Sequence, residues 1–381
     1  MCLAPVTEPA RWTPFIDHVP GGRITQFECF EDFALMQRWT EGQQVLTVVR
    51  RDATMEPVRI MDEPHDAEID ANPDYSADGV RISFQSLTVP RTVAYFRPGP
   101  NELSVLKRTE TPNCDLSLYS STREWAVAPD GTRIPVDIVH RADTPRDGTA
   151  PVLLYVYGSY EASMPPWFSV ARLSLLDRGW VWALAHPRGG GEMGRQWYLD
   201  GKLLAKRNTF TDTIAAAEHL AESGICDRSR IVVRGGSAGG LCVGACITMS
   251  PETFAGAIAE VPFVDIVTTM SDPTLPLTVT EWEEWGDPRE EPFASYMLSY
   301  SPFDNTHDAN YPSLYVTAGL NDPRVSFHEP AKWVAKLRDV SPSTTVVFRC
   351  EMGAGHGGPS GRYEQWRDEA RTLAFALRSV S

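Results

Sequence analysis

A short glycine-rich segment constrains this chain more than any other feature. Residues 231–241 read Ile-Val-Val-Arg-Gly-Gly-Ser-Ala-Gly-Gly-Leu, so an apolar run typical of a buried strand leads through Gly-Gly-Ser-Ala-Gly into a predicted helix. A G-x-S-x-G nucleophile elbow requires this context. Ser237 must then lie on a tight turn, where Gly235 and Gly239 let strand and helix approach closely. We predict that Ser237 is a nucleophile. The alternative is a glycine-rich turn with a serine of no special role.

The sequence after residue 120 predicts the fold around this elbow. Apolar runs typical of buried strands alternate there with amphipathic stretches typical of helices, which indicates a parallel sheet covered on both faces. The expected strands are 152–156, 180–184, 231–233, 255–259, 313–317 and 345–348, and the expected helices are 210–222, 241–249, 329–340 and 363–378. We therefore predict an α/β fold, with an α/β-hydrolase catalytic domain over residues 119–381.

The first 118 residues have a different character. Short apolar runs at 44–50, 80–86 and 92–96 are separated by clusters of turn residues, and no helical pattern interrupts them. This is typical of antiparallel strands. We expect a separate β domain over residues 1–118.

A serine nucleophile needs a base and an orienting carboxylate, which in this fold follow it in the order Asp or Glu, then His. Three histidines follow Ser237. His356 lies in a glycine-rich loop just after the strand expected at 345–348, whereas His307 lies in a polar loop and His328 at a predicted helix start. Because loops at the carboxyl ends of parallel strands carry the chemistry, we predict that His356 is the base.

The same argument selects the carboxylate. Asp322 follows the strand expected at 313–317, while Asp304 and Asp308 follow no buried strand directly. We expect Asp322 to orient the base.

An oxyanion formed during the reaction needs hydrogen-bond donors. One is the backbone N–H of Ala238, the residue after the nucleophile. Tyr157, in the loop after the strand expected at 152–156, is suited to be a second donor. From the residues alone, a core aromatic is an equally good interpretation of Tyr157.

Composition excludes few functions, but the net negative charge bears on which partners the chain can bind. The chain has 381 residues and a net charge of −15, with 42% hydrophobic and 22% charged residues, an ordinary globular balance. The negative charge disfavours nucleic acid and anionic membranes as partners and favours cationic ligands. Solubility alone is the simpler explanation of this charge.

The cysteines and the N-terminus bear on cofactors and location. The seven cysteines have no zinc-ligand or redox spacing. A serine triad needs no metal or cofactor, so we expect neither. No signal peptide is visible at the N-terminus, and no apolar stretch reaches membrane-spanning length. We expect a cytoplasmic protein that does not bind membranes.

Several motifs together resemble the prolyl oligopeptidase family of serine peptidases, most closely its oligopeptidase B branch. They occur in family order and cover nearly the whole chain from residue 120 to the C-terminus. The matching runs are 155–160 (Tyr-Val-Tyr-Gly-Ser-Tyr), 187–192 (Pro-Arg-Gly-Gly-Gly-Glu), 235–240 (Gly-Gly-Ser-Ala-Gly-Gly), 261–265 (Val-Pro-Phe-Val-Asp), 281–286 (Glu-Trp-Glu-Glu-Trp-Gly), 300–305 (Tyr-Ser-Pro-Phe-Asp-Asn) and 355–358 (Gly-His-Gly-Gly).

The resemblance implies the same triad of Ser237, Asp322 and His356, with the Tyr157 hydroxyl as an oxyanion donor. It also implies that the substrates are short peptides, because a β-propeller covers the active site in this family and excludes large ones. The branch prefers cleavage after Arg or Lys.

The carboxylates that bind the basic side chain in this branch match Glu281 and Glu283. A buried guanidinium needs such a partner. Without the resemblance, the acidic run 281–284 would be interpreted as solvated surface. Arg324 is expected to bind substrate as well.

Two departures from the family pattern matter. Pro165 and Trp167 occupy positions that are often acidic in the branch, so a preference for paired basic residues does not follow, and Trp167 is suited to stack on a side chain or a cation. About 120 residues precede the hydrolase domain, and since a blade needs four strands they form about two to three blades of an incomplete propeller. This leads us to expect an N-terminally truncated chain, partnered by a missing propeller fragment or by self-association.

The expected function is therefore a serine endopeptidase that acts on short basic peptides. An esterase or an aminoacyl-peptide hydrolase on the same fold is an alternative that the triad does not distinguish. A further alternative, of another class, is a non-catalytic remnant that needs a partner fragment.

Overall fold

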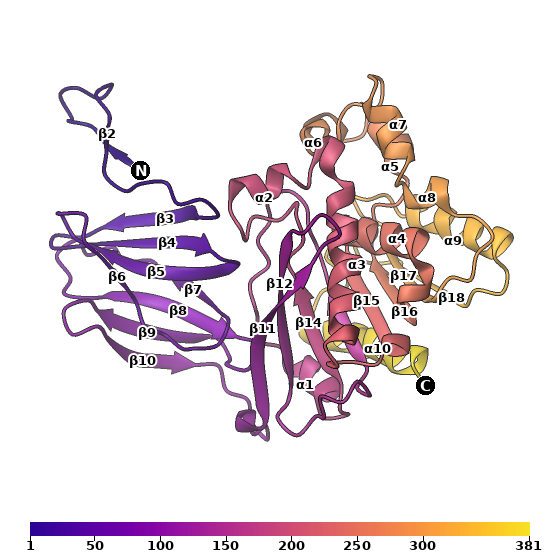
Figure 1. Cartoon of the computed structure of the whole chain (residues 1–381), viewed down its shortest axis with the longest axis horizontal. Coiled ribbons are helices and arrows are strands. Elements are labelled where there is room, and N and C mark those ends of the chain that lie inside the picture. The colour runs from indigo at the N-terminus through magenta and orange to yellow at the C-terminus, as the bar shows by residue number, and fades with distance from the viewer. The chain divides into compact units, whose positions relative to one another are not determined.

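A computed structural model describes all residues, 1–381, and divides them into two compact units (Figure 1). The N-terminal unit comprises Met1–Cys114 together with the short segments Pro165–Phe168 and Gly191–Trp197. The C-terminal unit comprises Asp115–Met164, Ser169–Gly190 and Tyr198–Ser381. The sequence pattern contains no sign that two short later segments belong to the first unit.

The N-terminal unit is built from two antiparallel sheets of four strands each, which corresponds to two propeller blades. In both sheets each strand pairs with the next strand along the chain, in the orders β3-β4-β5-β6 and β7-β8-β9-β10. The first contains β3 (Arg23–Cys29), β4 (Ala34–Thr40), β5 (Gln43–Val49) and β6 (Met55–Pro57); the second contains β7 (His65–Ile69), β8 (Val80–Ser86), β9 (Thr92–Arg97) and β10 (Glu102–Arg108). A two-stranded sheet of β1 (Cys2–Leu3) and β2 (Thr13–Pro14) precedes them.

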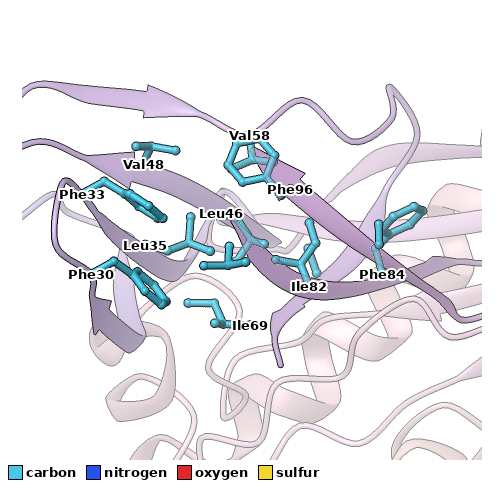
Figure 2. Packing of buried hydrophobic residues seen from close by; sticks show 13 residues of the cluster. Phe30, Phe33, Leu35, Leu46, Val48, Val58, Ile69, Ile82, Phe84 and Phe96 are labelled. Atoms are coloured by element: carbon cyan, nitrogen blue, oxygen red, sulfur yellow. The ribbon is translucent and has the colours of Figure 1, made fainter. Parts of the chain in front are cut away.

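The core of this unit follows from alternation along the strands. In β9, buried and half-buried residues alternate, because successive side chains of a strand point to opposite faces. Figure 2 shows the resulting cluster, to which both sheets contribute. Its larger members are Phe30, Phe33, Leu35, Leu46, Val48, Val58, Ile69, Ile82, Phe84 and Phe96. Burial of each such side chain contributes roughly 1.5–3 kcal/mol to stability.

The C-terminal unit contains one sheet of eight strands in the order β11-β12-β14-β13-β15-β16-β17-β18. A hairpin forms its first edge, and the six strands from β14 to β18 are parallel. The strands are β11 (Tyr119–Val127), β12 (Arg133–Arg141), β13 (Val152–Tyr155), β14 (Val181–Ala185), β15 (Ile231–Gly236), β16 (Gly256–Glu260), β17 (Ser313–Gly319) and β18 (Val346–Glu351). The predicted α/β class is confirmed.

Helices cover both faces of this sheet. Helix α4 packs on β15 and β16, and α3 packs beside it, whereas α10 packs on β16 and β17 and its neighbour α1 packs on β12 and β14 (Figure 1). The helices are α1 (Val170–Leu176), α2 (Arg195–Leu199), α3 (Arg207–Glu222), α4 (Ala238–Met249), α5 (Ile266–Ser271), α6 (Thr278–Trp285), α7 (Phe293–Leu298), α8 (Pro302–Asn305), α9 (His328–Val340) and α10 (Arg362–Ser379). The sequence pattern did not predict α1, α2, α5, α6, α7 or α8, and α6 covers the acidic run. No helix has both the length and the apolar composition needed to cross a membrane.

Candidate active site

Four of the predicted site residues lie at one edge of the parallel sheet. Ser237 directly follows β15, Tyr157 follows its neighbour β13, Asp322 follows β17, and His356 follows β18. The carboxyl ends of parallel strands meet at the same edge, where α/β proteins bind their ligands. The topology thus gathers four residues that are far apart in the sequence.

The nucleophile turn has an unusual backbone. Ser237 has φ 57° and ψ −121°, a region that a residue with a side chain occupies only when its surroundings hold it there. Its N–H donates to the Glu260 carbonyl at 2.8 Å, and its own carbonyl accepts from the Phe263 N–H at 3.2 Å and the Leu241 N–H at 3.1 Å. These three backbone bonds tie Ser237 to β16, to the loop after it, and to α4.

The glycines around Ser237 are required by close contacts between strand and helix. A Cβ at Gly235 would lie 2.4 Å from the Gly239 carbonyl oxygen, and a Cβ at Gly239 would lie 2.6 Å from the Val156 carbonyl oxygen. Both distances are far shorter than van der Waals contact. At Gly236 the nearest atom, the Glu260 carbonyl oxygen, would be 3.5 Å away. Steric exclusion therefore explains why Gly235 and Gly239 must be glycine, whereas position 236 has room for a side chain.

His356 and Asp322 form a hydrogen-bonded pair. His356 Nδ1 lies 2.7 Å from Asp322 Oδ2. The other carboxylate oxygen accepts from the backbone N–H groups of Arg324, at 2.8 Å, and Val325, at 3.0 Å. The carboxylate is buried, and the imidazole is one-fifth exposed. Because Asp322 occupies Nδ1, Nε2 is the nitrogen left for a proton transfer, although no hydrogen bond joins it to Ser237 here.

The other two candidate histidines have different surroundings. His307 Nδ1 lies 2.8 Å from the Asn305 carbonyl oxygen, and His328 is the exposed first residue of α9.

Tyr157 and Ala238 both lie at the start of α4. A Cβ at Gly239 would lie 3.3 Å from ring carbon Cδ2 of Tyr157, so the ring packs beside the first helical turn. Burial, with smaller contributions from Tyr155, Glu281 and Glu284, raises the pKa of Tyr157 to about 12. A tyrosine hydroxyl is already protonated at neutral pH, and the raised pKa favours the protonated form further. Ala238 is the first residue of α4, where backbone N–H groups have no acceptor within the helix.

Helix α6 places one carboxylate among aromatic rings. Glu281 Oε2 accepts from Tyr160 Oη and from Trp285 Nε1, both at 2.7 Å, while Oε1 has no partner in the protein. Trp285 is fully buried and contacts Tyr160 edge to face, with ring centroids 5.6 Å apart. It also contacts Phe263, at 5.5 Å, whose N–H bonds to Ser237. An aromatic wall thus connects the nucleophile turn to Glu281.

The other two glutamates of α6 point in different directions. Residues two apart on a helix do not share a face, whereas residues three apart do. Glu283 is accordingly 77% exposed and lies 3.5 Å from Lys202. Glu284 is buried on the same side as Glu281, with its Oε1 3.2 Å from Lys206 Nζ. The structure does not bring Glu281 and Glu283 together. The sequence analysis singled out neither Glu284 nor Lys206. Helical spacing from Glu281 was an available signal for Glu284, whereas Lys206 has no such signal.

Two further residues, Arg324 and Trp167, were predicted to bind substrate. Arg324 is exposed, and its positive charge makes a small contribution that lowers the pKa of Tyr157. Trp167 is half-buried in the segment Pro165–Phe168 and belongs to the N-terminal unit. No group of three or more His, Cys, Asp or Glu side chains in the molecule is arranged to hold a metal ion.

Comparison with known proteins finds one family. Residues 166–381 match the prolyl oligopeptidase family. The chain is 45% identical, over 96% of its length, to dipeptidyl aminopeptidase BI of Pseudoxanthomonas mexicana, of which it covers 51%. It is also 45% identical, over 80% of its length, to protease 2 of Moraxella lacunata, of which it covers 44%.

A solved structure is similar as well. Oligopeptidase B from Leishmania major matches with a TM-score of 0.92 and 36% identity, over 99% of this chain and 54% of that one. The resemblance seen in the motifs is thus confirmed. The chain spans about half the length of the curated relatives it matches.

Proposed function

The chain belongs to the prolyl oligopeptidase family of serine peptidases, and on that premise we propose that it is a serine endopeptidase that cleaves short peptides after Arg or Lys. One observation carries the proposal. The hydrogen-bonded pair of His356 and Asp322 lies at the same sheet edge as Ser237, whose strained backbone presents it between β15 and α4.

The proposed reaction has two stages. His356 Nε2 takes the proton of Ser237 Oγ while this oxygen attacks the peptide carbonyl carbon. The same nitrogen gives the proton to the leaving amine, the C–N bond breaks, and an acyl-enzyme remains. Water then attacks the acyl carbon of the ester and loses a proton to Nε2. The bond between this carbon and Ser237 Oγ breaks, Nε2 returns the proton to Oγ, and the peptide acid leaves. Asp322 keeps Nδ1 protonated and stabilises the imidazolium in both stages.

Two donors are suited to the negative oxygen that forms in each stage. The Ala238 N–H lies at the helix N-terminus, and the half-buried Tyr157 carries a hydroxyl proton that it can donate at neutral pH. Such donors stabilise charge that develops only in the transition state, so they increase kcat.

The preference for Arg or Lys rests on Glu281. Tyr160 and Trp285 both donate to its Oε2, which leaves Oε1 for a substrate. Among the rings of the wall, only Tyr160 is exposed, and its ring suits the aliphatic stem and planar head of an arginine, while the carboxylate suits its charge. The net charge of −15 favours the approach of basic peptides.

A dipeptidyl aminopeptidase is the second candidate, favoured by the 45% identity to a protein of that name. The two activities differ in what they require at the substrate N-terminus. An endopeptidase hydrolyses an arginyl amide reporter whose N-terminus is blocked, whereas a dipeptidyl aminopeptidase requires a free amine. Comparing both reporters on the same preparation distinguishes these candidates.

The central test is the S237A variant. We expect kcat for the blocked arginyl reporter to fall by about 10⁴ to 10⁶-fold, since removal of a triad serine has effects of this size. S250A, at the other end of α4, is the matched control and should retain wild-type kcat. Titration of the wild-type chain with a serine-reactive phosphonate counts competent sites. Equal activity in S237A and wild type, or a wild-type chain that is not titrated, would contradict the proposal.

A further inference from the structure

Lys206 is a fully buried cation beside the proposed active site. It immediately precedes α3, and its side chain is 1% exposed. Its ammonium group donates to the Gly158 carbonyl oxygen at 2.8 Å and to Ser159 Oγ at 2.7 Å, and it lies 3.2 Å from Glu284 Oε1. These contacts use all three of its donors. The ring of Trp285 lies 4.9 Å from Nζ.

The contacts of Lys206 converge on two elements of the site. Gly158 and Ser159 directly follow Tyr157 in the chain. Glu284 lies on α6, three residues from Glu281 and on the same helix face. Lys206 therefore connects the loop that carries the proposed oxyanion donor with the helix that carries the proposed specificity carboxylate.

The connected loop has a strained backbone. Gly158, Tyr160 and Glu161 have positive φ values of 74°, 62° and 56°. A Cβ at Gly158 would lie 2.5 Å from Thr209 Cγ2, so the loop is also tightly enclosed. Such a conformation persists only where surrounding contacts hold it, and the bonds from Lys206 are charge-assisted, hence stronger than neutral ones.

The buried ion pair of Lys206 and Glu284 contributes little net stability to the fold, so stability does not explain why two charges are buried here. Desolvation of two charges offsets most of their attraction, and apolar residues of similar volume are often as good or better in such places. We propose that Lys206 is a positioning residue, which holds the Tyr157 hydroxyl where the oxyanion forms and, through Glu284, ties this loop to the helix that bears Glu281. The inference rests on the proposed function, since it assumes that Tyr157 is an oxyanion donor.

A double-mutant cycle on the full chain tests this role. The variants are Y157F, K206M and Y157F/K206M, assayed with the blocked arginyl reporter, with kcat expressed per phosphonate-titrated site. We expect K206M to lower kcat by about 10 to 100-fold, because small misplacements of catalytic groups have effects of this size. KM should change by no more than about twofold. In the Y157F background, where no hydroxyl remains to be positioned, K206M should lower kcat by no more than about twofold further.

A merely structural role predicts a different pattern. K206M would then either leave kcat per titrated site unchanged or lower it by the same factor with and without the Tyr157 hydroxyl, and both results overturn the inference. K202M is the matched control. Lys202 also pairs with a glutamate of α6, Glu283, but has no hydrogen bond to the Tyr157 loop, so kcat should stay at the wild-type value.

Two further outcomes are separable. If K206M does not fold, K206M/E284L removes both charges and carries the same test, since it leaves no unpaired buried carboxylate. If Y157F alone leaves kcat unchanged, the oxyanion assignment in the proposed function is wrong. If Y157F is impaired and K206M is not, only the inference about Lys206 fails.

Discussion

The nucleophile turn at residues 235–240 and helix α6 at Thr278–Trp285 contribute to the same site in different ways. In the turn, backbone atoms lie so close that a Cβ at Gly239 would be 2.6 Å from the Val156 carbonyl oxygen. In α6, side-chain partners decide the role of each residue, with Glu281 among aromatic rings, Glu283 in solvent and Glu284 on Lys206. Steric constraints on the backbone of the turn require glycine at set positions, so the turn can be recognised as a motif in the sequence. The side-chain partners of α6 require no such pattern, so its sequence shows only an acidic run.

Among the variants that test this comparison, the largest effect should come from adding one methyl group to the turn. G239A removes a glycine from helix α4, which by helix propensity alone would stabilise it by about 1 kcal/mol. We expect the reverse, because the Cβ would displace the Tyr157 loop from the turn, and kcat should fall by about 100-fold or more. The matched control is G236A, whose Cβ has 3.5 Å of space. Wild-type kcat in G239A would show that close packing does not define the turn.

A smaller effect should distinguish the glutamates of α6. We expect E281Q to lower kcat/KM for the arginyl reporter by about 100-fold, since loss of one partner of a buried charge pair weakens binding by about 2–5 kcal/mol. E283Q should change it by no more than about twofold, because an exposed pair contributes little. Comparable losses in both variants would mean that the two carboxylates act as the pair that the family resemblance implies.

The smallest effect concerns stability near the turn. Glu329 on α9 is buried and accepts hydrogen bonds from the Val264 and Asp265 N–H groups, both at 3.2 Å, in the loop whose Phe263 bonds to Ser237. Burial raises the pKa of Glu329 from 4.5 to about 7. Between pH 4.5 and about pH 7, the Glu329 carboxyl binds more protons in the folded state than in the unfolded state. The free energy of unfolding therefore falls as the pH rises through this interval.

E329Q has no carboxylate to ionise. The difference in Tm, variant minus wild type, should therefore become more positive from about pH 5 to about pH 8. E222Q, at the exposed end of α3, should show a difference that is flat over the same interval. A difference for E329Q that is also flat would contradict a raised pKa at Glu329.

Much of the fold was open to prediction because its signals are local. The strand expected at 80–86 is β8 (Val80–Ser86), and the helices expected at 329–340 and 363–378 are α9 and α10 within one residue at each end. Helix α6 was missed because its eight residues include an acidic run that is equally typical of solvated surface. The assignment of Trp167 to the N-terminal unit depends on contacts that no local pattern encodes.

The sequence by itself determined the elbow around Ser237 and the strand ends that bring Asp322 and His356 to it, because steric exclusion and strand order act along the chain. The predicted pair of His356 and Asp322 is present, with 2.7 Å between Nδ1 and Oδ2. Only the tertiary structure decided the partners of the other charged side chains, such as Lys206, which pairs with Glu284, 78 residues away. A charged side chain leaves little local trace of its partner, because the energy of the pair depends on burial and distance, which exist only once distant segments have packed together.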